Sequence, residues 1–198
     1  MILIFIGKSG SGKDFARDYL ITEKGFQSII SHTTRPIREG EIDGKDYWFI
    51  TEDRFIEADY NNEFIETRSY NVDFEGEKTI WHYGTNIFEF KHKGFHSVAI
   101  KDLQGAKQIK EQFPKTKIIY VHCDDIVREH RAKSRGSFCQ TEWGRRLVKD
   151  NEDFSLDKLL GNVDYYLDNT NLSLEEFKQE LDNIIKIIYE EGNENEIS

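Results

Sequence analysis

A glycine-rich loop between a buried strand and a helix constrains this chain more than any other stretch. The sequence Gly-Lys-Ser-Gly-Ser-Gly-Lys-Asp at residues 7–14 follows the apolar run Ile2–Ile6, which predicts a short buried parallel strand. Apolar residues at helical spacing come after it. Glycine permits backbone angles that a side chain forbids, so the loop N–H groups turn inward around phosphate oxygens, at the positive end of the helix. We predict a nucleotide phosphate site made by Gly7, Lys8, Ser9, Gly10, Ser11, Gly12, Lys13 and Asp14, in which Lys13 reaches the outer phosphates as a point charge.

Asp14 stands where such loops usually carry Ser or Thr, whose hydroxyl binds Mg²⁺. A carboxylate is also a hard-oxygen ligand for Mg²⁺, so Asp14 is the candidate metal ligand. Three roles are open to it: direct coordination, coordination through a water molecule, or a charge that favours the start of the helix.

The composition restricts the class of partner. The 198 residues carry a formal net charge of −10, which argues against general binding to nucleic acid or to an anionic membrane. Cys123 and Cys139 provide neither a disulfide framework nor metal-site spacing. Met1 leads directly into the first strand without a basic leader, so we expect a cytoplasmic protein whose partners are small molecules. The sequence does not predict an oligomeric state.

Strands and helices alternate through most of the chain. Apolar runs at 27–30, 96–100, 117–121 and 163–167 predict strands, and the segments 103–113 and 174–188 predict helices. This order predicts an α/β fold in which a parallel sheet is covered by helices on both faces and binds ligands at the carboxyl ends of its strands. We expect a core of residues 1–30, 91–124 and 154–198, an insert at 31–90 and a lid at 125–153.

The insert and the lid differ from the core in composition. The insert predicts strands at 46–50 and 64–66, a hairpin of 70–72 with 79–83, and a short helix capped by Thr51. The lid is rich in cations, which form either a solvated helix face or an anion-binding group. These cations are Arg128, Arg131, Lys133, Arg135, Arg145, Arg146 and Lys149.

Together these segments resemble the guanylate kinase family of P-loop nucleoside monophosphate kinases. The most specific match is the segment 31–41 followed by Gly-Lys-Asp-Tyr at 44–47, which is similar to the part of the family that grips the phosphate of guanylate. The stretches 64–66, 83–85 and 102–105 match others that surround the base and the phosphate. The resemblance implies a substrate site of Ser31, Arg35, Arg38, Tyr47, Glu66, Tyr83, Thr85 and Asp102.

In the family, lid arginines close over the transferring phosphate. The resemblance assigns that catalytic role, with Lys13, to Arg131, Arg135 and Arg146, and it places Asn169 near the adenine of ATP. Two further departures concern the acceptor. The stretch between Glu66 and Tyr83 is longer than is usual, and Ile100 stands where the family usually has the first of two aspartates.

The resemblance implies ATP-dependent phosphorylation of GMP and dGMP with Mg²⁺ as cofactor. A carboxylate at Glu66 suits guanine, because it accepts from the N–H donors at N1 and N2. Two alternatives remain open. One is a P-loop kinase for another nucleotide, deoxynucleotide or small phosphorylated metabolite, and the other is a guanylate kinase-like module that binds peptides.

Overall fold

The centre of the molecule is a five-stranded sheet. In the computed structural model, which describes residues 1–74, 76–91, 96–134 and 138–194, it contains β1 (Ile2–Ile6), β2 (Gln27–Ser28), β7 (Ser97–Ile100), β8 (Lys117–His122) and β9 (Tyr165–Asp168). The order is β2-β7-β1-β8-β9, and every pair is parallel. The predicted parallel sheet is confirmed, although β2 and β9 are shorter than the runs at 27–30 and 163–167.

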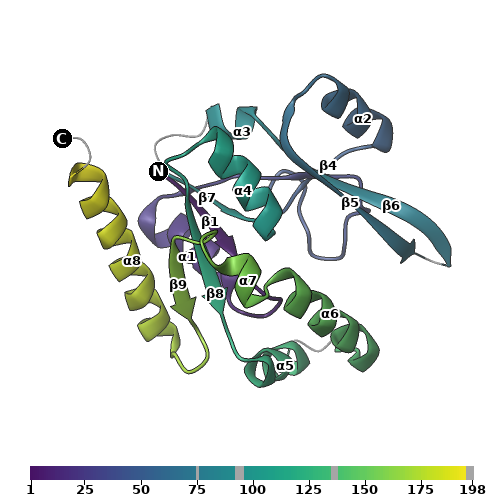
Figure 1. Cartoon of the computed structure of the whole chain (residues 1–198). Helices are drawn as coiled ribbons and strands as arrows, with labels where there is room; N and C mark the ends of the chain where they lie inside the picture. The colour runs from purple at the N-terminus through teal and green to yellow at the C-terminus, as the bar shows by residue number, and fades with distance from the viewer. Residues whose placement is uncertain (75, 92–95, 135–137, 195–198) are drawn as a thin grey trace.

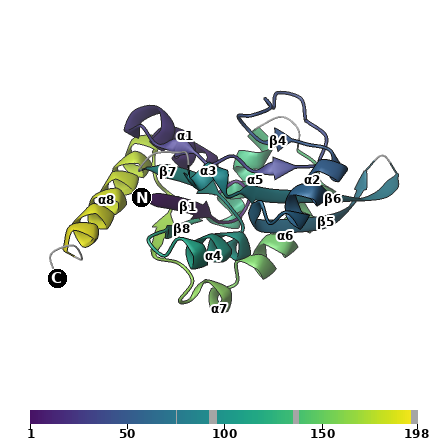
Figure 2. The same cartoon turned by 90° about the horizontal axis from the view of Figure 1, so that it is seen from above.

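Helices cover both faces of this sheet, as predicted (Figures 1 and 2). Leu3 and Phe5 of β1 pack toward α1 (Lys13–Lys24) and α8 (Leu174–Glu194). Ile4 and Ile6 face the opposite way, toward α4 (Leu103–Gln112) and α7 (Leu156–Leu159). Successive side chains of a strand point to opposite faces, so a sheet buried on both sides requires the continuous apolar run of β1. Each of these side chains contributes about 1.5–3 kcal/mol when fully buried.

A second sheet projects beside the first and is made within the segment 31–90. It contains β3 (His32–Thr33), β4 (Trp48–Phe49), β5 (Phe64–Phe74) and β6 (Glu77–Asn86), in the order β4-β3-β6-β5. The predicted strands at 64–66 and 70–72 are parts of one continuous strand, β5, and its antiparallel pairing with β6 confirms the predicted hairpin of 70–72 with 79–83. Backbone pairing holds the polar middle of β5 in a strand, where residues 68–73 alternate between partly buried and exposed side chains.

The remaining helices lie around the two sheets. They are α2 (Glu52–Tyr60), α3 (Phe88–Lys91), α5 (Asp125–Ser134) and α6 (Gln140–Asp153). The hydroxyl of Thr51 accepts a hydrogen bond from the Arg54 N–H (3.3 Å), which confirms the predicted cap of α2. The short helices α3 and α7 were not predicted. None of the described helices has the length and apolar character needed to cross a membrane.

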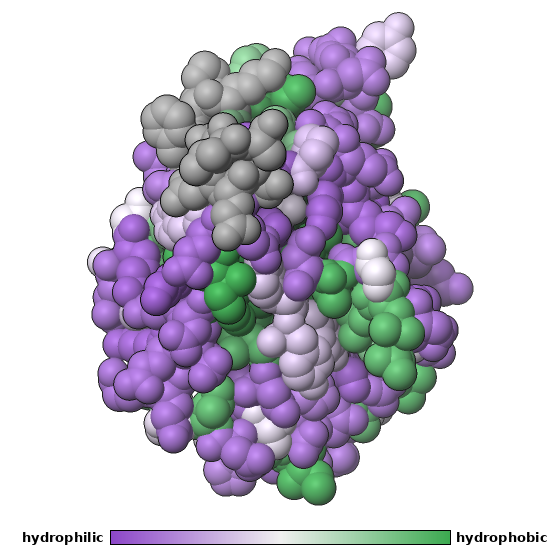
Figure 3. All heavy atoms as spheres, turned by 60° about the vertical axis from the view of Figure 1, so that its left-hand side comes forward, coloured by the Kyte–Doolittle hydropathy of each residue, from purple (hydrophilic) through white to green (hydrophobic). Residues whose placement is uncertain are grey.

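The molecular surface reflects the charged composition. Figure 3 shows a face dominated by hydrophilic side chains, with hydrophobic ones in small, separate groups. The two buried apolar clusters lie on either side of the central sheet, between the sheet and its helices.

Candidate active site

The glycine-rich loop leaves the carboxyl end of β1 and enters α1. Gly7, Gly10 and Gly12 have φ angles of +146°, +78° and +111°, which side chains rarely adopt. At Gly7 a Cβ atom would also lie 2.4 Å from the carbonyl oxygen of Val121. The ammonium of Lys13 donates to the carbonyl oxygen of Lys8 (2.8 Å), so it lies across the loop. This conformation turns the loop into a cradle for an anion.

Asp14 lies in the first turn of α1 with its side chain 71% exposed, 3.9 Å from the guanidinium of Arg17. It lines a cavity of about 270 Å³ together with Glu41 and Tyr47. The start of α1 and the segment predicted to grip a phosphate therefore face the same space.

Arg35 is the buried cation of that segment. Its side chain is 3% exposed, and its guanidinium donates to both carboxylate oxygens of Glu41 (2.7 and 3.0 Å). Hydrogen bonding to Arg35 is the main reason why the pKa of Glu41 lies below its usual value. A guanidinium held in this way matches the geometry of a phosphate as well as that of a carboxylate.

Tyrosine rings surround the Arg35 guanidinium. It lies 5.4 Å from the centre of the Tyr47 ring, which meets the Tyr83 ring edge to face at 5.9 Å. Arg38 is exposed, and its backbone N–H donates to Glu41 (2.8 Å). The structure thus brings Arg35, Tyr47 and Tyr83 together and leaves Arg38 at the rim.

Glu66 lies at the bottom of an adjoining cavity of about 300 Å³. Its Oε1 atom accepts from the hydroxyl of Thr85 (2.5 Å) and from the ammonium of Lys101 (2.9 Å). Burial favours protonation of Glu66, but Lys101 and Thr85 outweigh it, so the pKa of Glu66 lies below its usual value. The two cavities share Ser31, Tyr47 and Ile100, and so adjoin each other.

Asp102 lines the cavity but is already engaged with protein groups. Its Oδ1 atom accepts from the N–H of Gly105 (2.6 Å) and caps α4, while Oδ2 accepts from the Tyr70 hydroxyl (3.1 Å) and lies 3.3 Å from Arg68. These contacts make Asp102 a residue that positions the start of α4 beside the cavity.

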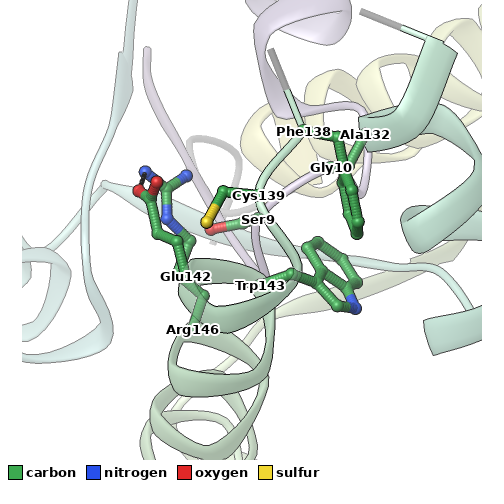
Figure 4. Close-up of a pocket in the computed structure, with 8 residues that line it drawn as sticks. All are labelled: Ser9, Gly10, Ala132, Phe138, Cys139, Glu142, Trp143 and Arg146. Carbon is green, nitrogen blue, oxygen red and sulfur yellow. Dashed lines mark hydrogen bonds and ion pairs between the residues drawn. The ribbon is translucent and has the colours of Figure 1, made fainter. Parts of the chain in front are cut away.

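The lid cations have separate surroundings. Arg131 donates to the carbonyl oxygen of Asn169 (3.0 Å) and contacts the thiol of Cys123. Arg146, 51% exposed, pairs with Glu142 one turn away, and Figure 4 shows these two side chains extending together from α6 beside a pocket that Ser9 also lines. Arg135 lies outside the described residues.

Asn169 is buried and contacts the backbone of the glycine-rich loop. Its amide donates to the carbonyl oxygen of Ser11 (2.8 Å). A Cβ atom at Gly12 would lie 2.4 Å from that amide. Asn169 therefore shapes the loop, and its position near the adenine of ATP stays a prediction.

Arg128 connects the loop to the lid and is fully buried. Its guanidinium donates to the carbonyl oxygen of Ser9 (2.6 Å) and to Asp125 (2.5 Å), and it also pairs with Asp150. Asp150 in turn accepts from the Ser9 N–H (3.0 Å). The interpretation of the lid cations as an exposed face is thus wrong for Arg128.

Comparison with known proteins agrees with this arrangement. The guanylate kinase family model matches residues 1–187. The chain belongs to the guanylate kinase family. The guanylate kinase of Lactobacillus johnsonii is 34% identical over 69% of this chain and 66% of its own length, just under two thirds. That of Prochlorococcus marinus is 31% identical over 86% of this chain and 90% of its own.

A solved structure shows the same fold. The crystal structure of guanylate kinase from Anaplasma phagocytophilum superimposes with a TM-score of 0.61 at 21% identity, over 94% of this chain and 85% of that one. The P-loop kinase core and the membership of the guanylate kinase family, both predicted from the sequence, are confirmed.

Sequence reasoning missed the polar partners that complete this guanylate kinase-like site. Glu41 lies within the segment 31–41 that was predicted to bind phosphate, but no role was predicted for it. No role was predicted for Lys101 either. A signal for Lys101 existed, because it directly follows an apolar strand whose carboxyl end faces the ligand space. For Arg128 the only local signal is Asp125 three residues earlier, which does not indicate burial.

Proposed function

We propose that this chain transfers the γ-phosphoryl group of ATP to GMP and dGMP, giving ADP and the nucleoside diphosphate. The observation that carries the proposal is a pair of adjoining cavities, one lined by Asp14, Glu41 and Tyr47 and the other by Tyr47, Tyr83 and Glu66. Phosphoryl transfer requires two phosphates to be aligned in such a space and their charge to be offset.

Each cation has a place in this reaction. Lys13 stabilises charge on the outer phosphates of ATP, and Arg35 with Arg38 holds the acceptor phosphate. The phosphate of the acceptor replaces the Glu41 carboxylate on Arg35. A planar carboxylate and a tetrahedral phosphate can each accept two hydrogen bonds from a guanidinium. An acceptor phosphate oxygen attacks the γ-phosphorus and ADP leaves, so no general base is required.

The lid arginines complete the charge when the lid closes. Arg131 and Arg146 are bound to protein groups in this structure, so closure over the phosphate requires those contacts to open. Arg135 belongs to the same proposal. Closure also excludes water and so limits hydrolysis of ATP.

Magnesium fits this site as an ion held mainly by the nucleotide. Asp14 is the exposed carboxylate beside Lys13, and one carboxylate with phosphate oxygens is a common ligand set for Mg²⁺. In the described part of the chain, no group of three or more His, Cys, Asp or Glu side chains forms a metal site by itself. When bound, Mg²⁺ supplies positive charge to the β- and γ-phosphates.

The test is a coupled assay of ADP release with ATP and GMP, on the unmodified chain, Lys13→Ala and Lys24→Ala. Lys24 lies in the same helix and pairs with Asp182 at the protein surface, so its substitution is the matched control. We expect Lys13→Ala to lower kcat by about 10²–10³-fold with an unchanged circular dichroism spectrum, and Lys24→Ala to stay within about twofold. A folded Lys13→Ala protein with near-normal turnover would overturn the proposal.

A further inference from the structure

Lys101 brings a positive charge into the part of the site predicted to read the base. It follows β7, and its ammonium donates to the hydroxyl of Ser31 (2.5 Å) and to Oε1 of Glu66 (2.9 Å), and also contacts the hydroxyl of Thr85. The side chains of Lys101 and Glu66 are only 6% and 5% exposed. Every residue expected to bind the base by hydrogen bonding therefore shares this ammonium as a neighbour.

The pair changes what Glu66 offers to a base. A lone carboxylate offers two acceptor oxygens, which suits the two neighbouring N–H donors of guanine. Here Thr85 and Lys101 both occupy Oε1. Among the described residues no hydrogen bond reaches Oε2, so one acceptor oxygen remains for a ligand.

Lys101 places an ammonium next to that acceptor. Its three N–H groups meet Ser31, Thr85 and Glu66 in this structure, so donation to a base requires one of these contacts, that with Ser31, to open. An ammonium has N–H groups and no acceptor, so it selects a base atom with a lone pair. The complementary base edge is a carbonyl beside a ring N–H, which guanine and hypoxanthine present as O6 and N1–H and which uracil and thymine present as O4 and N3–H. Adenine presents the reverse order, an amino donor beside a ring acceptor.

Among the described residues, position 100, where the family usually has an aspartate on the base-binding side, carries no group that accepts from the 2-amino group of guanine. Ile100, which lines both cavities and directly precedes Lys101, has an apolar side chain. A base without the 2-amino group therefore leaves no buried carboxylate unpaired at position 100. The site should tolerate the loss of that amino group from the base.

We propose that Lys101 is a specificity-determining residue that donates to O6 of the base while Oε2 of Glu66 accepts from N1–H. Among purine nucleotides, the acceptors are then the 6-oxopurine nucleoside monophosphates as a class, with IMP used alongside GMP. This inference rests on the proposed function, because it assigns the base contacts of the same acceptor site.

The test compares GMP, IMP and AMP on the unmodified chain, Lys101→Met and Lys115→Met. Methionine keeps most of the length of lysine and removes its charge. Lys115 is exposed and precedes β8, at the amino end of the parallel strands, whereas Lys101 follows the carboxyl end of β7, so Lys115 controls for the loss of one charge. Turnover is measured with ATP, and binding of each monophosphate is measured without ATP by titration calorimetry.

For the unmodified chain we expect kcat/KM with IMP to lie within about tenfold of GMP, and both to exceed AMP by about 10²-fold or more. Lys101→Met should lower kcat/KM and affinity for GMP and IMP alike by about tenfold or more, and change AMP by less than about threefold. Lys115→Met should leave all three unchanged.

Two results would overturn the inference. One is unmodified protein that uses IMP no better than AMP while it phosphorylates GMP, in which case the proposed function stands. The other is a Lys101→Met protein that gains affinity for GMP over IMP. Lys101 would then only block an acceptor oxygen of Glu66 and would not donate to the base. Conversely, the expected binding pattern without any transfer from ATP would remove the proposed function and leave the assignment of Lys101 intact.

Discussion

Replacement of Arg128 by methionine should destabilise the protein far more than the same change at Arg146. The Arg128 side chain is fully buried, and its guanidinium is shared by Ser9, Asp125 and Asp150. It also lies 5.3 Å from the centre of the Trp143 ring. Removing one partner of a buried ion pair destabilises a protein by about 3–5 kcal/mol.

The magnitude for Arg128 belongs at the lower end of that range. The Asp125 side chain is 41% exposed and that of Asp150 is 14% exposed, so water solvates part of the charge left behind. We expect a loss of about 3 kcal/mol in the free energy of unfolding, which lowers the Tm of a chain of this size by about 6–12 °C. The exposed pair of Arg146 with Glu142 should change stability by no more than about 0.5 kcal/mol.

Urea unfolding followed by far-ultraviolet circular dichroism measures both variants against the unmodified chain. An unchanged m-value with a lower midpoint would assign the loss to the folded state. If Arg128→Met and Arg146→Met unfold within about 0.5 kcal/mol of each other, the Arg128 network does not stabilise the junction of loop and lid.

Other perturbations have equally definite expected outcomes. Asp14→Asn should raise the Mg²⁺ concentration needed for half-maximal rate and leave nucleotide binding without metal unchanged; an unaltered Mg²⁺ titration would limit Asp14 to starting the helix. Arg35 lowers the pKa of Glu41 in the folded state, so ionised Glu41 stabilises the fold at pH values above its unfolded pKa. This stabilisation is lost as the pH falls through the folded pKa of Glu41. Urea unfolding should therefore show Glu41→Gln about 1 kcal/mol less stable at pH 7, with a difference that shrinks as the pH falls below the unfolded pKa, whereas a constant difference would contradict this. Gly12→Ala should destabilise by about 2–4 kcal/mol, because its φ is +111° and the new Cβ meets Asn169. Gly144→Ala, in open space within α6, should stabilise by about 0.5–1 kcal/mol, and thermal denaturation that moves both variants in the same direction would refute the reasoning.

The sequence by itself determined the elements whose cause is local. Glycines at Gly7, Gly10 and Gly12 require a special backbone whatever surrounds them, and the apolar run of β1 requires burial on both faces. The cap of α2 and the capping box formed by Ser173 and Glu176 are likewise set by neighbours within three residues. These features were enough to predict the parallel sheet, the phosphate loop and the family.

Only the tertiary structure decided how the site is charged. Lys101 meets Glu66 across 35 residues, and Arg128 meets Ser9 across 119. Neither pairing has a periodicity or spacing in the chain, because burial and charge neutralisation arise only when separate elements pack together. The length of β5 was decided in the same way, since its polar middle is held by hydrogen bonds to β6. The chain therefore encodes its phosphate loop locally, whereas the groups that would choose the base are brought together only by the fold.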